Sequence, residues 1–592
     1  MKAMRHDRTG RIIPIALCAC GLALAGCVQL GIDKLERLRW QEDIYPEATA
    51  PDAPLVVILP GLRITILNVA QQQYSGHLIE MLAREGIPAR HILYDTKEHP
   101  LSRKAAVFSE DLAIAWTRVG PGIVRELELE NERRGKLGLP PVTKLVLFAY
   151  SQGSPIMEQI ARKLFYEFPK QVEKVLAKYG DEWDAIRNDP QFASFIEALE
   201  DFLVIKNIKV QREEEFMRVP DLRAYYARAE KRMFDRFDGF LQYLIDPSTA
   251  YPDATDFEEP DSLKYPKRYY KAREWADGLS SRTPEDVQKM REFFVNYAEY
   301  RPLLDVTPYF FSVGGTYLGS PQANVGVSLL ERFPAFKIFT LHEYKQIQQT
   351  QYGTSYHMAS IEELAALQKK DPHPIDPKRT LFVVGTVGGK GDGFIEEESA
   401  HMSDHSFTLI RVEEPAGADG DVRLTTIEET RLPDLPVLPV KALHFPIKWR
   451  ILGRIFRYGV AYMTPDNPVF PYFMSFIRGD WDAISDRLAK SNIHLSQFML
   501  QVAFPGEEKF GDKVTHAGHS QNVSVGKRIV NPESDTAVWA GRFKGREQEM
   551  KLIGETARGT VHLELQLDGG RKVPLDCTVY PGCASFVKLT RE

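Results

Sequence analysis

A serine lies at the tip of a predicted strand–turn–helix unit in residues 144–164. The apolar run at 145–148 predicts a buried strand, and apolar residues at helical spacing follow from 156 to 164. Ser151 lies in the short turn between them, two residues before Gly153. A hydroxyl on such a turn can act as a nucleophile if a histidine takes its proton and a carboxylate orients that histidine. The alternative is a surface serine in an ordinary turn.

The stretch Ala149-Tyr150-Ser151-Gln152-Gly153 resembles the nucleophile elbow of α/β-hydrolases, in the Ala-x-Ser-x-Gly form that some lipases use. The resemblance implies an α/β-hydrolase core with Ser151 as its nucleophile. Ala149 departs from the more common glycine, but it keeps that flanking position small. Because five-residue patterns recur by chance, the strand before the motif and the helix after it carry much of the inference.

The same family carries its acid in an Asp-Gly-x-Val-x-x-x-Ser-Ala stretch. Residues 392–400, Asp-Gly-Phe-Ile-Glu-Glu-Glu-Ser-Ala, are similar to it and follow an apolar run at 380–384. The resemblance implies that Asp392 is the acid of the triad, with Glu396 and Asp404 as alternatives. Phosphate binding by the neighbouring glycines is disfavoured, because Asp392 would repel an anion and no Gly-Lys-Ser/Thr sequence follows.

A histidine follows the last predicted core strand, at 435–443. In α/β-hydrolases the triad appears along the chain as serine, acid and histidine. Ser151, Asp392 and His444 follow that order, and the resemblance implies that His444 is the general base. His401 and His405 are also close to the acid in sequence, and His405 is the competing candidate.

The reaction also needs two N–H groups that bind the negative charge of the tetrahedral intermediate. By resemblance these are the backbone amides of Gln152 and Leu62, the latter in the loop after the predicted strand at 55–59. On its own, Pro60-Gly61 in that loop is more simply a strand-ending turn. Acyl transfer to water through these groups requires neither a metal nor an organic cofactor.

Alternating strands and helices predict an α/β fold with a doubly wound parallel sheet. The predicted strands are residues 55–59, 89–94, 145–148, 309–313 and 380–384, with helices at 74–85 and 105–137. The α/β-hydrolase core would span 54–164 and 306–470. The segment between them, 165–305, is helical, charged and rich in tyrosine, and it is too long for a connector. It resembles the helical cap inserted in lipases, and a structural insertion remote from catalysis is the alternative.

Residues 480–592 contain β-like segments separated by Gly and Asp-Gly turns. They predict a C-terminal β-rich, sandwich-like domain. Cys577 and Cys583 are expected to form a disulfide in an oxidising compartment. His516 and His519 lie three residues apart, but without further ligands they do not predict a metal site.

The N-terminus has the pattern of a bacterial lipoprotein signal peptide. Basic residues precede an apolar stretch that ends in Leu24-Ala25-Gly26-Cys27, which resembles a lipobox. The resemblance implies cleavage of residues 1–26, lipidation of Cys27 and a tether over 27–53. The protein is then expected to be extracytoplasmic and anchored to a bacterial membrane, with Val28 favouring the outer membrane. A plain secretory signal is the alternative.

Residues 447–462 combine isoleucines with Lys448, Arg450, Arg454 and Arg457. Their spacing predicts a basic amphipathic helix, which could lie on anionic lipid. A helix packed on the core with a solvated basic face is the favoured interpretation.

The composition is typical of a globular protein. The chain has 592 residues, of which 26% are charged and 43% hydrophobic, and its net charge of −6 suggests no nucleic-acid partner. Together the motifs predict a membrane-anchored serine hydrolase of esterase or lipase type, acting on acyl esters that include lipid and phospholipid esters. The rivals are an acyltransferase with the same triad and a non-catalytic lipoprotein that uses the fold as a binding scaffold. No protein partner is predicted.

Overall fold

A computed structural model describes the chain in two compact units. The first unit comprises Met1–His91, Val146–Pro155 and Tyr309–Glu592, and the second comprises Ile92–Leu145 and Ile156–Pro308. The described residues are 46, 48–61, 77–92, 115–179, 301–320, 344–351, 354–371, 376–387, 391–413, 423–444, 447–451, 454–458, 462, 468–491, 497–504, 513–516, 523–530, 537–544, 559–566, 572–579 and 583–590, with isolated positions between 194 and 332.

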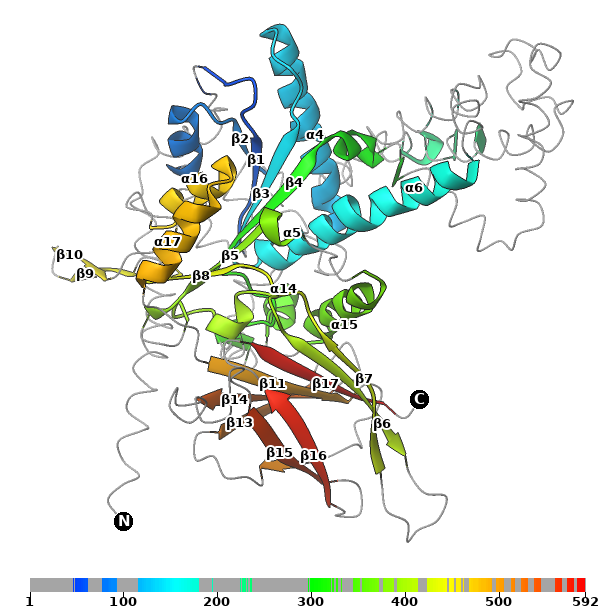
Figure 1. The fold of residues 1–592 in the computed structure, drawn as a ribbon, viewed down its shortest axis with the longest axis vertical. Coiled ribbons are helices and arrows are strands. Elements are labelled where there is room, and N and C mark those ends of the chain that lie inside the picture. The colour runs from blue at the N-terminus through cyan, green and yellow to red at the C-terminus, as the bar shows by residue number, and fades with distance from the viewer. Residues whose placement is uncertain are drawn as a thin grey trace, which may run out of the picture. The chain divides into compact units, whose positions relative to one another are not determined.

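A six-stranded sheet in the order β2-β1-β3-β4-β5-β8 runs through the first unit (Figure 1). Its strands are β1 (Leu55–Leu59), β2 (Ala89–His91), β3 (Lys144–Tyr150), β4 (Thr307–Val313), β5 (Thr380–Gly385) and β8 (Val437–Val440). The pairs β1–β2, β4–β5 and β5–β8 are parallel. Every residue of β1 and β5 is buried, which is why these strands read as continuous apolar runs. The predicted α/β fold is confirmed.

Aromatic side chains join one face of this sheet to helices α16 (Phe470–Arg478) and α17 (Trp481–Ser491) (Figure 1). The ring of Phe473 in α16 meets Phe148 of β3 at a centroid distance of 4.9 Å and Phe311 of β4 at 4.7 Å. Helix α16 ends at Gly479, whose φ of +73° gives the left-handed cap that glycine favours. The core between this face of the sheet and helix α16 therefore contains a cluster of aromatic rings.

The second unit contains long helices. Helix α4 (Trp116–Lys136) lies within the helix predicted at 105–137 and continues through Pro121. Pro121 is the sixth residue of this helix, so its missing N–H removes one intrahelical hydrogen bond without ending the helix. The segment 165–305 includes α6 (Phe168–Tyr179) and is helical at every described position.

A second six-stranded sheet has the order β13-β14-β11-β17-β6-β7. Its strands are β6 (Ser406–Glu413), β7 (Arg423–Arg431), β11 (Gln497–Phe504), β13 (Val523–Val530), β14 (Ala537–Lys544) and β17 (Ala584–Thr590). The antiparallel hairpin of β6 and β7 thus pairs with C-terminal strands, although it lies within 306–470, which the sequence assigned to the second part of the core. Strand β17 runs parallel to both β6 and β11. A local pattern cannot reveal a partner strand so far along the chain.

A three-stranded antiparallel sheet consists of β12 (Lys513–His516), β15 (Gly559–Gln566) and β16 (Lys572–Val579). The β-like segments at 494–504, 523–530, 537–543, 561–567 and 586–589 predicted β11, β13, β14, β15 and β17, whereas β12 and β16 were not predicted. His516 is the last residue of β12, and His519 lies outside the described residues.

The predicted basic helix at 447–462 is wrong. These residues form an antiparallel hairpin of β9 (Ile447–Ile451) and β10 (Arg454–Tyr458). Isoleucine and aromatic residues favour strands, and Gly453 in the sequence disfavours a continuous helix. Lys448 and Arg450 lie two residues apart, which is a strand period that the helical spacing of the later arginines concealed.

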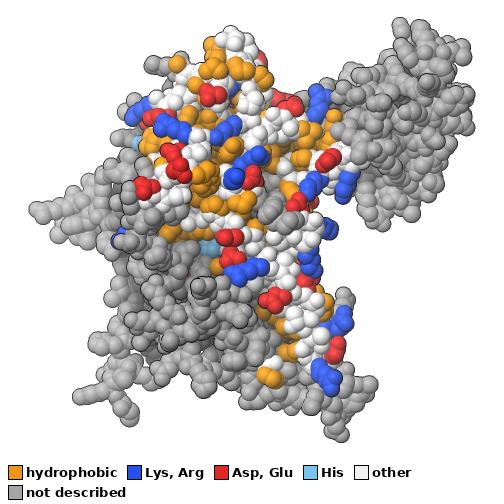
Figure 2. Space-filling view, in the orientation of Figure 1, with side chains coloured by type: hydrophobic (Ala, Val, Ile, Leu, Met, Phe, Trp, Pro, Cys, Tyr) orange, Lys and Arg blue, Asp and Glu red, His pale blue; other side chains and the backbone are white. Residues whose placement is uncertain are grey.

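On the face drawn in Figure 2, the described acidic, basic and apolar side chains are interspersed, and neither charge sign forms a continuous field there. Among the described residues, no helix is both long enough and apolar enough to cross a membrane.

Candidate active site

Ser151 stands at the turn between β3 and helix α5 (Gly153–Arg162). Its φ of +55° lies in the left-handed region, which costs a residue with a side chain roughly 1–2 kcal/mol. Two backbone bonds maintain this conformation: the Ser151 N–H donates to the Val313 carbonyl at 3.0 Å, and the Ser151 carbonyl accepts from the Ser154 N–H at 3.0 Å. The predicted sharp turn is therefore present. The hydrogen bond to Val313, the last residue of β4, helps to hold Ser151 in its strained conformation.

The three predicted triad side chains form one chain of hydrogen bonds. The Nε2 atom of His444 lies 2.9 Å from the Oγ atom of Ser151, and its Nδ1 atom lies 2.7 Å from Oδ2 of Asp392. All three residues are buried. Both imidazole nitrogens are thus occupied by groups that an acyl-transfer mechanism requires: a hydroxyl to deprotonate and a carboxylate to orient the ring.

The Asp392 carboxylate is held by its own loop. Its Oδ1 atom accepts hydrogen bonds from the N–H groups of Phe394 at 2.9 Å and Ile395 at 2.7 Å, which leaves Oδ2 for His444. The backbone also joins acid and base, because the His444 N–H donates to the Asp392 carbonyl at 3.0 Å. Gly391 begins this turn with a φ of +86°, and a side chain there would overlap the Ile395 carbonyl.

Aromatic rings surround the His444 imidazole. Tyr150 stacks on it at a centroid distance of 4.9 Å and Phe394 at 5.8 Å. Tyr462 meets it edge-on at 6.2 Å. These contacts restrict rotation of the imidazole and keep water from its faces.

The predicted oxyanion donors are described in part. Gln152 is buried, and its side-chain amide donates to the Thr350 hydroxyl at 2.8 Å. Its backbone N–H donates to no described backbone carbonyl. Leu62 lies outside the described residues, although Pro60 and Gly61 before it are buried.

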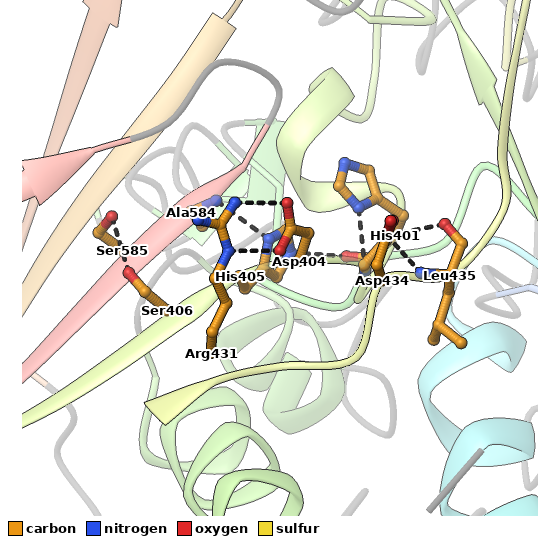
Figure 3. A network of polar contacts seen from close by, with 10 residues as sticks. His401, Asp404, His405, Ser406, Arg431, Asp434, Leu435, Ala584 and Ser585 are labelled. Atoms are coloured by element: carbon orange, nitrogen blue, oxygen red, sulfur yellow. Dashed lines mark hydrogen bonds and ion pairs between the residues drawn. The ribbon is translucent and has the colours of Figure 1, made fainter. Parts of the chain in front are cut away.

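His405, the competing base, has a structural position (Figure 3). Its Nε2 atom lies 2.8 Å from the His401 carbonyl oxygen, and its Nδ1 atom accepts the Ala584 N–H at 3.0 Å. Burial, followed by the nearby His401, lowers the pKa of His405 well below its usual value. A neutral imidazole with a proton on Nε2 satisfies both bonds, so His405 connects the loop after the acid to β17.

The two alternative acids, Asp404 and Glu396, do not bind the His444 imidazole. Asp404 has a φ of +57° and forms a two-pronged ion pair with Arg431 (Figure 3). Glu396 precedes the short helix Glu397–Ser399. Because Asp392 occupies Nδ1 of His444, neither of the two alternatives is the hydrogen-bond partner of the imidazole.

The predicted Cys577–Cys583 disulfide is not formed in the structure, where Cys583 is a free thiol. Cys577 lies within β16, paired with Val561 of the three-stranded sheet, whereas Cys583 immediately precedes β17 of the other sheet. The short spacing therefore spans a change of sheet rather than a tight loop. Burial raises the pKa of the Cys583 thiol to about 12, which keeps it protonated and poorly reactive. No group of three or more acidic, histidine or cysteine residues within the described ranges could hold a metal ion.

Sequence reasoning missed four residues around the triad: Tyr150, Thr350, Phe394 and Tyr462. Tyr150 and Phe394 occupy variable positions of the two motifs, where a bulky aromatic residue beside a catalytic one was the available signal. Thr350 and Tyr462 lie in segments with no motif. Only the three-dimensional fold brings them to the site.

No protein-family model matches the chain, and no curated protein matches it. Seven solved chains match in structure. They include the phospholipase PlaB from Legionella pneumophila in complex with thio-NAD and a second structure of PlaB, with TM-scores of 0.41 and 0.43. In both comparisons 10% of residues are identical, over 91% of this chain and 93% of PlaB. Such a distant likeness assigns neither a reaction nor a residue role to this chain.

Proposed function

We propose that this chain is a serine hydrolase that cleaves carboxylic esters of acyl chains, lipid esters included. Ser151 is the nucleophile, His444 the general base and Asp392 the orienting acid. The observation that carries the proposal is the uninterrupted hydrogen-bond chain between them, at 2.9 and 2.7 Å, with the serine on a left-handed turn. Strain at a non-glycine residue is retained where the surrounding structure over-determines it, and functional sites are where it concentrates.

In the acylation half of the reaction, the Ser151 oxygen attacks the ester carbonyl carbon while its proton moves to Nε2 of His444. The carbonyl oxygen becomes an oxyanion, and the backbone N–H groups of Gln152 and Leu62 donate to it. The imidazolium is stabilised by the Asp392 carboxylate and returns its proton to the alkoxy leaving group. The products are an alcohol and an acyl ester on Ser151.

In the deacylation half, the neutral His444 takes a proton from water, and the resulting hydroxide attacks the acyl carbon. Collapse of the second tetrahedral intermediate returns the proton to the Ser151 oxygen and releases the carboxylic acid. If an alcohol replaces water in this half, the same residues carry out acyl transfer. Product analysis with added alcohol separates the hydrolase from the acyltransferase.

The membrane setting is part of the proposal. The lipobox-like sequence before Cys27 supports a diacylated N-terminus, and Val28 supports the outer membrane. An enzyme tethered in this way meets acyl esters of lipids as its most concentrated substrates. In this proposal the insertion at 165–305 serves as the helical cap of the hydrolase. Replacing Cys27 with serine should abolish incorporation of labelled palmitate and shift the protein from the membrane to the soluble fraction.

The decisive experiment is labelling of the detergent-solubilised full chain with a fluorophosphonate, beside hydrolysis of short p-nitrophenyl esters. The wild type should label and turn over, and Ser151→Ala and His444→Ala should lose both activities. His405→Gln is the matched control, because glutamine preserves an acceptor for the Ala584 N–H and His405 does not touch the triad. A folded wild type that neither labels nor hydrolyses any ester would support the scaffold alternative. If His405→Gln lost labelling and His444→Ala kept it, the general base would be His405 instead of His444.

A further inference from the structure

Tyr462 lies beside the triad although it belongs to none of the motifs. The residue is 0% exposed, and its ring meets His444 at a centroid distance of 6.2 Å and Tyr150 at 6.3 Å. Its backbone N–H donates to the Leu443 carbonyl at 3.2 Å, so it is fixed directly beside the base. Its hydroxyl oxygen lacks a hydrogen-bond partner of good geometry among the described residues. A buried hydroxyl without a partner costs roughly 1–3 kcal/mol, which calls for an explanation.

Two glycines make room for this side chain. A Cβ on Gly314, at the end of β4, would lie 2.9 Å from Cε2 of Tyr462 and 3.0 Å from Oδ2 of Asp392. A Cβ on Gly385, the last residue of β5, would overlap the Tyr462 hydroxyl and lie 2.5 Å from Cβ of Asp392. The ring, its hydroxyl and the acid therefore border the same two small spaces.

The groups around the Tyr462 hydroxyl determine whether it donates or accepts a hydrogen bond. Burial raises the pKa of Tyr462 well above its usual value, and the negative charge of Asp392 raises it further. The phenol therefore keeps its proton and can act as a donor. Asp392 has received three donors, from Phe394, Ile395 and His444, and a carboxylate has about four acceptor sites.

We propose that Tyr462 is a positioning residue whose hydroxyl donates to the Asp392 carboxylate and fixes it against His444. The hydroxyl and the carboxylate both border the spaces that Gly314 and Gly385 leave, and the donated bond would form there. Tyr462 touches no substrate and acts through Asp392 alone. The inference rests on the proposed hydrolase function, because an orienting acid matters only if His444 works as a base.

Tyr462→Phe tests the role, because it removes one oxygen and keeps the ring. We expect kcat to fall roughly 10- to 100-fold with little change in KM. Without the donor, the carboxylate stabilises the protonated base more strongly, so the acidic limb of the kcat/KM profile should move to higher pH by about half a unit. If Tyr462 only filled space, the substitution would lower stability and leave the pH profile of kcat/KM unchanged.

Tyr317→Phe is the matched control. Tyr317 is also buried, and its hydroxyl also belongs to the packing around the central sheet, but it donates to Ser312 at 2.8 Å. Its loss should lower stability without moving the pH profile. Equal shifts in both variants would overturn the inference, as would a Tyr462→Phe profile identical to that of the wild type.

Two further measurements keep the inference testable if Tyr462→Phe folds poorly. Incorporation of 3,5-difluorotyrosine at position 462 makes the hydroxyl a stronger donor and should move the acidic limb to lower pH. In an Asp392→Asn background, Tyr462→Phe should cause no further loss in the rate of fluorophosphonate labelling. A further loss equal to that in the wild-type background would overturn the inference. Failure of the wild type to label would instead overturn the proposed function, so the two failures are distinguishable.

Discussion

The ring of Tyr150 stacks on the imidazole of His444 at a centroid distance of 4.9 Å and an interplanar angle of 21°, and its hydroxyl donates to the His444 carbonyl oxygen. The residue before the proposed nucleophile thus holds both the ring and the backbone of the proposed base. This contact joins the end of β3 to the segment after β8, so the proposed base is held by the residue that precedes the proposed nucleophile.

Replacing Tyr150 separates these two contributions. Tyr150→Phe keeps the stacked ring and loses one hydrogen bond, so unfolding free energy should fall by about 1 kcal/mol and kcat by less than about tenfold. Tyr150→Ala also leaves a cavity and should cost about 3–5 kcal/mol, with a much larger loss of kcat. Urea unfolding and ester hydrolysis measure both effects. If the phenylalanine variant proves as damaging as the alanine variant, the ring does not support the base.

The loop of the acid contains a matched pair of glycines. Gly391 and Gly393 have nearly equal φ values, +86° and +87°, so alanine should cost each about 1–2 kcal/mol in backbone strain. At Gly391 the added carbon would also overlap the Ile395 carbonyl, whereas at Gly393 it would lie 3.7 Å from Leu443.

We therefore expect Gly391→Ala to abolish ester hydrolysis or soluble expression, and Gly393→Ala to remain active with modestly reduced stability. Hydrolysis rates and thermal unfolding of the two variants provide the comparison. Equal behaviour would mean that the Asp392 turn tolerates displacement.

Substitution with asparagine distinguishes the role of Asp392 from that of Asp404. Asp392→Asn should lower kcat roughly 10⁴-fold, because the amide no longer holds the imidazole in its working tautomer. Asp404→Asn should retain wild-type turnover. Asparagine tolerates a left-handed backbone, and a partly exposed ion pair contributes at most about 1 kcal/mol. Steady-state hydrolysis decides between them, and a larger loss in Asp404→Asn would reassign the acid.

Three histidines whose pKa values burial lowers, His91, His357 and His405, should make stability depend on pH. Burial lowers the pKa of His91 and of His357 to about 4 and the pKa of His405 well below its usual value, whereas all three titrate near 6.5 in an unfolded chain. As pH falls below about 6.5, the unfolded state takes up protons that the folded state does not. Unfolding free energy should therefore decrease from pH 6.5 toward about 4, by up to about 1.4 kcal/mol per pH unit for each histidine.

His357→Leu should reduce that pH dependence by about one proton. Urea unfolding at pH 5 and pH 7 measures the difference. An unaltered dependence in His357→Leu would show that His357 is protonated in the folded protein or that other groups dominate.

The features that could be predicted from the sequence have local signals. The runs at 55–59 and 380–384 predicted β1 and β5 because strands buried on both faces are apolar without interruption. Ser151 was recognisable because its turn needs small neighbours between a strand and a helix. The proximity of Asp392 and His444 followed only from a family resemblance, since neither residue is distinctive by itself.

The remaining features depend on contacts between distant segments. Tyr462 reaches the triad because glycines at the ends of two different strands leave space for it, and no pattern in its own segment indicates this. The β9–β10 hairpin was mistaken for a helix because a short basic and apolar segment fits both periods. The pairing of β6 with β17 was hidden for the same reason as Tyr462: the partner is remote.

The bond between His405 and the Ala584 N–H spans 179 residues of chain. At about 5–20 residues per second, a ribosome needs roughly 10–40 s to travel that distance. During this interval the loop that follows Asp392 lacks the strand against which it rests, and any fragment that ends before Ala584 lacks it permanently. Hydrolytic competence should consequently appear late in biosynthesis, well after the triad itself has been translated.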